Sequence, residues 1–325
     1  GWVERRLSGN HRDKLPLPLK AAGGAVLALA SIALVAATLL PSRTEGQLTL
    51  YDGDYSEVKL MHAMVELLVE DKTDLDVVIL DQMTQVNNHN ELKGANPSCD
   101  LMFSYDGTVL TTFLGLDTSD IPEGETLYDF ANRAVQEREG LRLLGKVGLN
   151  NTYSIGVTQS VIDQYGAARV SDLIPVAGEL DFGAEHEFYT EEGSMKYQPF
   201  VDFYGLQFKS AKPVDVVLKY SAVESGAFDV MVVYATDGLN KRAGLTILED
   251  DLGFFPEYYG AFLVREDLFS DFYDTAPNLE QVLELLTGQV SSEDMVELTY
   301  AVDVDGRPVA EVAHAFLVSK GLLTA

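Results

Sequence analysis

The stretch "QLTLYDGDYSEVKLMHAMVELLVEDKTDLDVVIL", residues 47–80, gives the clearest indication of the fold. Its first seven residues predict a strand that ends in a glycine turn, and "DLDVVIL" predicts a second, β-branched strand. Between the two, a helix is predicted with Ser56 as its N-cap. Apolar side chains recur there at helical spacing, at Val58, Leu60, Met61, Met64, Leu67 and Leu68.

The same alternation of strand and helix patterns continues along the chain. Strands are expected at "CDLMFSY", "LRLLGKV", "YSIGV", "FDVMVVY", "LTILED" and "AFLVRED", and helices at "ETLYDFANRAVQERE", "NLEQVLELLTG", "SSEDMVELTYAVD" and "VAEVAHAFLVSKG". This order predicts an α/β fold with mostly parallel sheets, whose ligands bind beyond the carboxyl ends of the strands. A chain of 325 residues is long enough for about two packed units.

The chain is strongly acidic, with a formal net charge of −28. Residues 1–46 carry six Lys or Arg and three acidic side chains, whereas the remainder carries 17 basic and 48 acidic side chains. An acidic surface of this kind repels nucleic acid and attracts cations. We therefore expect no nucleic-acid partner.

Residues 21–42, "AAGGAVLALASIALVAATLLPS", contain no charged side chain. An apolar run of about 20 residues crosses a bilayer as a helix. Five of the six basic side chains in residues 1–46 precede it, which predicts a cytoplasmic stub at residues 1–20 and an extracellular position for the chain after the span, at the cell membrane. A cleaved signal peptide is the alternative, for which "ATLLPS" is a poor cleavage site.

The sequence offers little for catalysis or metal binding. Cys99 is the single cysteine, and the five histidines show no metal-binding spacing. Walker A, G-x-G-x-x-G and G-x-S-x-G motifs are also missing. We therefore expect neither an enzyme nor a cofactor.

Tyrosines stand where the predicted strands begin or end. Tyr105 follows "CDLMFS", Tyr234 ends "FDVMVV", and Tyr258 follows "LEDDLGFFPE". Tyr153 begins the strand "YSIGV". A single tyrosine in such a place is usually part of the core or its rim, but four of them indicate a shared site.

Several short segments, in this order and spacing, resemble the substrate-binding proteins of quaternary-ammonium ABC importers, the glycine betaine, choline and carnitine class. The resemblance covers residues 47–325. The segments are "YDGDYSEV" (Tyr51–Val58), "DLMFSYDGT" (Asp100–Thr108), "NNTY" (Asn150–Tyr153), "ATDG" (Ala235–Gly238), "FFPEY" (Phe254–Tyr258) and the tail from Met295 to Leu323. In addition, "GWVERRLSG" looks like the end of a permease subunit, so the chain is expected to be the C-terminal part of a permease–receptor fusion.

The resemblance implies a two-lobed periplasmic-binding-protein fold of type II, which closes like a flytrap. Residues 47–150 and 257–325 would form one lobe, and residues 151–256 the other. It also implies a quaternary ammonium ligand held in a cage of aromatic rings. The partners would be a permease, in the same chain or a separate subunit, and a separate ATPase subunit. The cage positions carried over to this chain are Tyr105, Tyr153, Tyr234 and Tyr258.

The chain departs from the family where a ligand carboxylate is held. Betaine binders of this type use a lysine and an arginine. Gly53 stands at the lysine position, and Glu191 or Glu192 at the arginine position. A carboxylate beside Glu191 would be repelled, so the resemblance combined with these departures favours a cation without a carboxylate.

Three polar positions complete the expected site. Asp106 replaces the family's threonine, Asn151 replaces an aspartate, and Thr108 is kept and can hydrogen-bond a hydroxyl group. Choline is the simplest ligand that meets these conditions. If Lys196 or Arg242 reaches the site, a zwitterion such as glycine betaine, carnitine or an ergothioneine-like betaine becomes the alternative.

A membrane sensor that uses the same binding domain is a second alternative of a different class. Several hydrophobic spans upstream would indicate transport, whereas a signalling domain would indicate sensing.

Overall fold

The computed structural model describes residues 46–190, 194–215 and 217–325, which form two α/β lobes. The first lobe contains two small sheets. In one of them, β1 (Gln47–Gly53) pairs in parallel with β2 (Asp76–Met83). In the other, β10 (Gly260–Arg265) lies between β3 (Leu101–Tyr105) and β4 (Leu141–Leu143).

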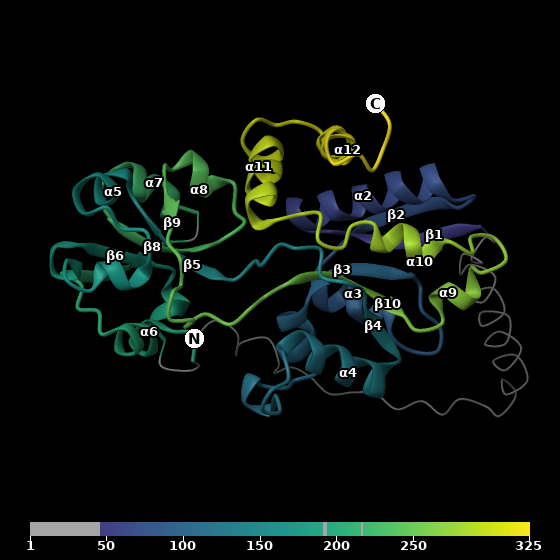
Figure 1. The fold of residues 1–325 in the computed structure, drawn as a ribbon, viewed down its shortest axis with the longest axis horizontal. Helices are drawn as coiled ribbons and strands as arrows, with labels where there is room; N and C mark the ends of the chain where they lie inside the picture. Colours follow the sequence, from purple (N-terminus) through teal and green to yellow (C-terminus); the bar gives the residue numbers. More distant parts are fainter. Residues whose placement is uncertain (1–45, 191–193, 216) are drawn as a thin grey trace, which may run out of the picture. The chain divides into compact units, whose positions relative to one another are not determined.

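The second lobe is built on one five-stranded sheet of order β7-β6-β8-β5-β9. Figure 1 shows the elements of this sheet gathered apart from β1, β3 and β10. Its strands are β5 (Tyr153–Val157), β6 (Asp181–Ala184), β7 (Ser210–Pro213), β8 (Val230–Tyr234) and β9 (Thr246–Ile247).

The prediction of mostly parallel sheets was wrong. β1 with β2, and β6 with β7 and β8, are parallel pairs, but β10 is antiparallel to both β3 and β4, and β5 is antiparallel to both β8 and β9. β10 enters the first lobe after the chain has returned from the second, and it therefore runs against the strands already there. This return direction could not be read from strand patterns alone.

Helices cover the sheets of both lobes. Those of the first lobe are α2 (Ser56–Lys72), α3 (Gln85–Leu92), α4 (Leu127–Glu139), α9 (Leu268–Asp271), α10 (Leu279–Glu284), α11 (Ser292–Asp303) and α12 (Val309–Ser319). Those of the second lobe are α5 (Gln159–Tyr165), α6 (Tyr197–Tyr204), α7 (Lys219–Glu224) and α8 (Leu239–Arg242).

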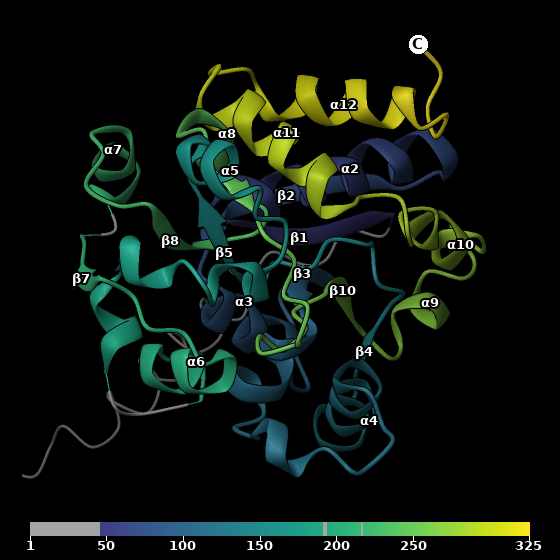
Figure 2. The same cartoon turned by 60° about the vertical axis from the view of Figure 1, so that its left-hand side comes forward.

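Helix α2 forms the centre of the first lobe. Its apolar side chains are buried in one core with β1, β3 and the C-terminal helices, and α10, α11 and α12 all contact it (Figure 2). The predicted N-cap was wrong by one position, because the helix begins at Ser56 and its N-cap is Tyr55. The Ser56 hydroxyl instead donates to Asp303 at 2.7 Å, which ties the start of α2 to the end of α11.

Two segments connect the lobes, and they are hydrogen-bonded to each other. Asn151 N donates to the Tyr258 carbonyl oxygen at 2.9 Å, and the Thr152 hydroxyl donates to the Pro256 carbonyl oxygen at 2.8 Å. A further contact between the lobes lies at Gly238, whose N–H donates to the Thr299 hydroxyl at 3.0 Å. A Cβ at Gly238 would lie 2.4 Å from Tyr300 N, so this approach requires glycine.

The predicted membrane span, residues 21–42, and the stub before it lie outside the described residues. Among the residues that are described, we find no helix with the length and apolar character needed to cross a bilayer. The lobe boundaries expected from the resemblance stay a prediction.

Candidate ligand-binding site

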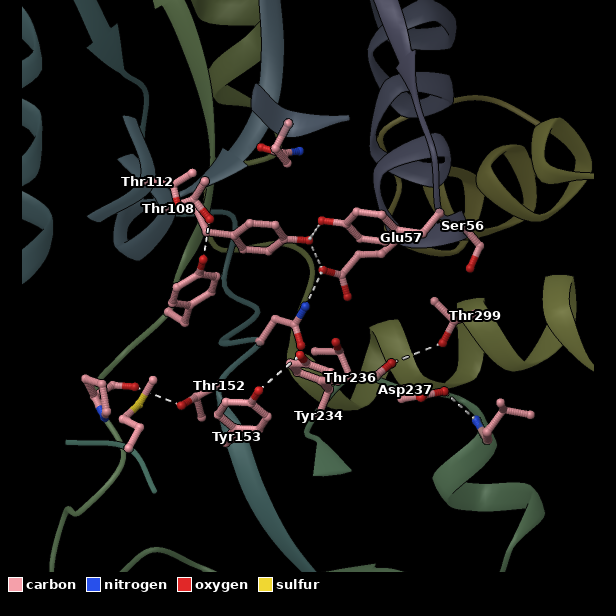
Figure 3. Close-up of a pocket in the computed structure, with 18 of the residues that line it drawn as sticks. Ser56, Glu57, Thr108, Thr112, Thr152, Tyr153, Tyr234, Thr236, Asp237 and Thr299 are labelled. Atoms are coloured by element: carbon pink, nitrogen blue, oxygen red, sulfur yellow. Dashed lines mark hydrogen bonds between the residues drawn. The ribbon is translucent and has the colours of Figure 1, made fainter. Parts of the chain in front are cut away.

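A cavity of about 710 Å³ is lined by residues of both lobes (Figure 3). Six of the eight predicted site residues line it: Tyr105, Thr108, Asn151, Tyr153, Tyr234 and Tyr258. The structure thus brings together tyrosines that are up to 153 positions apart in the sequence.

Strand register explains how the second-lobe tyrosines meet. β5 runs antiparallel to β8, so Tyr153 at the start of one strand is directly opposite Tyr234 at the end of the other. Side chains opposite each other on one face of a sheet are close neighbours. The two rings are stacked, with centroids 4.9 Å apart and an interplanar angle of 21°, and the Tyr234 hydroxyl donates to the Tyr153 hydroxyl at 3.4 Å.

The first-lobe tyrosines form a second stacked pair. Tyr105 ends β3 and is in register with Gly260 of β10, while Tyr258 lies two residues before Gly260. The two ring centroids are 5.2 Å apart, with an interplanar angle of 25°. The second-lobe pair forms across an antiparallel ladder, and the first-lobe pair forms just beyond the end of one. Each lobe therefore contributes two rings to the cavity.

Local contacts fix the ring of Tyr258. An ideal Cβ at Gly107 would lie 2.3 Å from this ring, so only glycine permits the ring to pack there. The hydroxyl groups of Thr108 and Tyr258 are hydrogen-bonded to each other. Thr108 begins a short π-helix, Thr108–Phe113, and single π turns often occur at functional sites.

Three of the rings, those of Tyr105, Tyr234 and Tyr258, stay neutral near physiological pH. Burial raises the pKa of Tyr105, Tyr234 and Tyr258 above the ordinary value. The cavity therefore presents the electron-rich faces of phenols rather than phenolate charges.

Two important lining residues, Tyr55 and Glu57, were missed by the sequence analysis. The Tyr55 hydroxyl donates to the Tyr105 hydroxyl at 3.0 Å, and the Tyr105 hydroxyl donates to the Glu57 carboxylate. Asn151 Nδ2 also donates to Glu57, at 3.2 Å. Glu57 is only 3% exposed, and burial raises the pKa of its carboxyl group. Both residues lie in the segment Tyr51–Val58, which resembles the family's opening motif and could have indicated that they line the site.

Asp106 is not among the residues that line the cavity. Asp106 is fully buried and its Oδ1 accepts hydrogen bonds from the N–H groups of Gly107 and Tyr259, at 2.7 and 2.9 Å. It therefore holds the backbone beneath the first tyrosine pair, contrary to its predicted place beside the ligand. Glu191 and Glu192 lie outside the described residues.

The charged groups of the described cavity wall are all acidic. Glu57, Asp237 and Asp303 line it, and none of the described lining residues is Lys or Arg. Lys196 Nζ donates to the Glu187 carbonyl oxygen, and Arg242 pairs with Glu224 at 4.0 Å. These are the two basic residues that would have favoured a zwitterion if either reached the site. Both pair with other residues, and neither lines the cavity.

Lys219 is a basic side chain near one of the four tyrosine rings. Its Nζ lies 5.5 Å from the Tyr234 ring centroid and pairs with Glu185 Oε1 at 3.0 Å. It does not line the cavity. The remaining lining residues are Ser56, Gln85, Thr112, Thr152, Met195, Thr236, Leu239, Pro256 and Thr299.

Comparison with known proteins identifies the family. Residues 46–319 match the model of the substrate binding domain of ABC-type glycine betaine transport systems. The carnitine transport binding protein OpuCC of Listeria monocytogenes (strain 10403S) is 28% identical over 264 residues, 81% of this chain and 83% of that protein. A crystal structure of a glycine betaine/carnitine/choline ABC transporter superposes with a TM-score of 0.77 at 25% identity, covering 86% of this chain and 99% of that one.

A longer relative is similar over part of its length. The ergothioneine transport permease/ergothioneine binding protein EgtU of Helicobacter pylori (strain G27) is 30% identical over 223 residues, which is 69% of this chain and 38% of that protein. The resemblance inferred from the motifs is thus confirmed across nearly all of the described residues. The chain belongs to the substrate-binding domains of ABC-type glycine betaine transport systems.

Proposed function

We propose that this domain is the extracytoplasmic receptor of an ABC importer and binds a small quaternary ammonium cation between its lobes, with choline preferred over glycine betaine. The observation that carries the proposal is the pairing of four tyrosines in one cavity, two from each lobe. No bond of the ligand is made or broken in this function.

Aromatic faces suit this ligand because a quaternary ammonium has no N–H group to donate. The electron-rich face of a ring attracts the cation directly, and each contact contributes about 0.5–2 kcal/mol. Four contacts together would supply up to ~8 kcal/mol, which corresponds to micromolar affinity.

The acidic wall supports the choice of a ligand without a carboxylate. Glu57, Asp237 and Asp303 would repel the carboxylate of glycine betaine, and no described lining residue is a cation that would hold it. The Thr108 hydroxyl is hydrogen-bonded to Tyr258, a member of the first tyrosine pair. It can also accept a hydrogen bond from the hydroxyl group of choline or donate one to it.

Binding would close the lobes. A cation that contacts rings of both lobes stabilises the closed form selectively, which is the condition for a ligand to shift a conformational equilibrium. The closed receptor would then dock on a permease, and a separate ATPase subunit would drive import. Residues 21–42 would anchor the receptor on the outer side of the cell membrane, an expectation that rests on the sequence alone.

The chain is proposed to be the C-terminal part of a permease–receptor fusion. The name of the Helicobacter pylori relative joins a permease and a binding protein, and this chain spans 38% of its length. Sequencing upstream of Gly1 tests this proposal: several hydrophobic spans would support it, and a signalling domain would overturn it in favour of a sensor.

Calorimetric titration of the chain with choline and with glycine betaine tests the ligand preference. We expect choline to bind more tightly, by about tenfold or more, because repulsion of one carboxylate by a partly desolvated acid costs at least ~1.4 kcal/mol. Tighter binding of glycine betaine would contradict the proposal.

Ergothioneine is the second candidate, and the 30% identity to the Helicobacter pylori protein favours it. It carries a trimethylammonium group that suits the same rings, but it also carries a carboxylate. Including ergothioneine in the titration decides between it and choline. If ergothioneine binds more tightly, the proposal of an aromatic cage still holds, but the proposed preference for a ligand without a carboxylate is wrong.

A further inference from the structure

The Glu57 carboxylate is a buried acid in the wall of the ligand cavity. It is 3% exposed, although it belongs to the first turn of α2, where acids usually face water. Figure 3 shows its side chain directed from α2 toward Thr236 of the second lobe. An acid in this place is costly to bury unless a cation or several donors accompany it.

Hydrogen bonds prepare this carboxylate for the ionised state. Tyr55 donates to Tyr105, and Tyr105 donates to Glu57, so the two phenols form a chain of donors that ends on the carboxylate. Asn151 Nδ2 adds a further donor from the segment that connects the lobes. Such chains strengthen the final hydrogen bond and favour a negative acceptor.

The described surroundings give Glu57 no cation. Its salt-bridge partners would be Lys, Arg or His, yet none of the described ion pairs involves Glu57 and no described lining residue is Lys or Arg. The titratable groups that act on it are Tyr105 and Asp237, with Tyr55 one hydrogen bond further away. Burial and the charge of Asp237 raise the pKa of Glu57, while its donors lower it.

We propose that Glu57 is a specificity-determining residue whose carboxylate is the counter-ion of the ligand's ammonium group. It would attract a net cation, repel a zwitterion's carboxylate, and leave the uncharged analogue of the same shape unaffected. The inference rests on the proposed function, since it assumes that an onium ligand occupies the tyrosine cavity.

A consequence of this arrangement is proton release. A carboxyl group that keeps its proton more readily because it is buried gives it up when a cation arrives beside it, since the cation favours the charged form. Choline binding at mildly acidic pH would therefore release a fraction of a proton, and the uncharged analogue would release none.

The test is calorimetric titration of the chain and its Glu57→Gln variant. The ligands are choline and the carbon analogue in which a tert-butyl group replaces the trimethylammonium group, and each is titrated in two buffers of different ionisation enthalpy. We expect Glu57→Gln to weaken choline binding by about 10- to 100-fold and to abolish proton release. Binding of the carbon analogue should change little.

A structural role of Glu57 predicts a different result. If Glu57 only held the ring of Tyr105, Glu57→Gln would weaken both ligands equally and the proton release would not depend on it. Either finding overturns the inference while the proposed function survives. If the unmodified chain binds no onium compound at all, the proposed function fails first.

Glu66→Gln is the matched control. Glu66 lies on the same helix, is also an acid whose pKa is raised by burial, and does not line the cavity. We expect this variant to bind choline and to release protons as the unmodified chain does. A loss equal to that of Glu57→Gln would show that any acid on α2 has the effect, which contradicts a specific counter-ion.

Discussion

The Tyr105–Tyr258 pair of the first lobe and the Tyr153–Tyr234 pair of the second have similar ring geometry but are held differently. Their centroids are 5.2 Å and 4.9 Å apart. Tyr105 is 2% exposed and is hydrogen-bonded to buried neighbours, whereas Tyr234 is 39% exposed and its hydroxyl donates to Tyr153. We infer that the first lobe presents a rigid half of the site and the second lobe a half that gains burial only with ligand.

This difference matters for the mechanism. A half of the site whose side chains are already buried loses little further conformational entropy when the ligand binds. A half whose side chains are exposed gains the most buried surface when the lobes close. The ligand would therefore settle on the first lobe and draw the second lobe over it. The predictions below test this contrast, beginning with the largest effect.

Replacing Tyr105 with Ala should damage both folding and binding. The ring is part of the first-lobe core, next to Phe103 and Tyr258, and removing a buried aromatic ring costs about 3–5 kcal/mol of stability. Urea unfolding measures this loss, and titration with choline measures the binding. If Tyr105→Ala proved as stable as the parent chain, the first-lobe pair would not be the rigid half.

Protonation of Asp106, which follows Tyr105 of the first-lobe pair, should make the free energy of unfolding depend on pH. Burial raises the pKa of Asp106 to about 7, against an ordinary value of 3.8. The native state then holds a proton that the unfolded state has lost, so the free energy of unfolding falls as the pH rises from 3.8 to about 7. The contribution lost is up to ~4 kcal/mol at 1.36 kcal/mol per pH unit.

Asp106→Asn should remove this part of the pH dependence. The amide keeps an oxygen that can accept from Gly107 and Tyr259 but cannot ionise. Urea unfolding across this pH range checks it, with Asp305→Asn, an exposed position, as the control. An unchanged pH profile in Asp106→Asn would mean that the acid is ionised in the native state without penalty.

Replacing Tyr234 with Ala should weaken binding and leave folding nearly intact. The free energy of unfolding should change by less than about 0.5 kcal/mol, as is usual at exposed positions. Choline affinity should fall by about 2- to 30-fold, since one cation–π contact is lost. A large loss of stability would show that the second pair is as firmly built as the first.

Tyr234→Phe should have the smallest effect. The ring face remains, and only a hydroxyl with one long hydrogen bond, 3.4 Å to Tyr153, is removed. We expect choline affinity to weaken by less than about threefold, because that bond is at the weak end of the range. A loss as large as that of Tyr234→Ala would mean that the hydroxyl, not the ring, recognises the ligand.

Local patterns in the sequence placed tyrosines at strand ends, and the resemblance to the family implied that four of them form a cage. Tyrosines at strand ends, the glycine after Asp106 and the order of the motifs are all visible in the chain. The relative direction of the paired strands could not be predicted, because the antiparallel pairing of β5 with β8 depends on where the chain returns to the sheet. That pairing, rather than strand ends meeting at a parallel edge, brings Tyr153 to Tyr234.

The errors at individual residues have the same origin. Asp106 follows Tyr105 directly and was expected beside the ligand, but its side chain is directed at backbone N–H groups of another segment. Glu57 was passed over because an acid at the start of a helix normally faces water. Its burial is produced by β3 and by the segment between the lobes, which are 48 and 94 positions away along the chain.

The central claim is that the tyrosine-lined cavity recognises positive charge, and comparing choline with its uncharged carbon analogue by calorimetry tests it most directly. The two molecules have the same shape and hydroxyl group, so only the charge differs. With four contacts of at least 0.5 kcal/mol, choline should bind at least about 30-fold more tightly. Equal affinities would contradict the account, because the cavity would then select for shape alone.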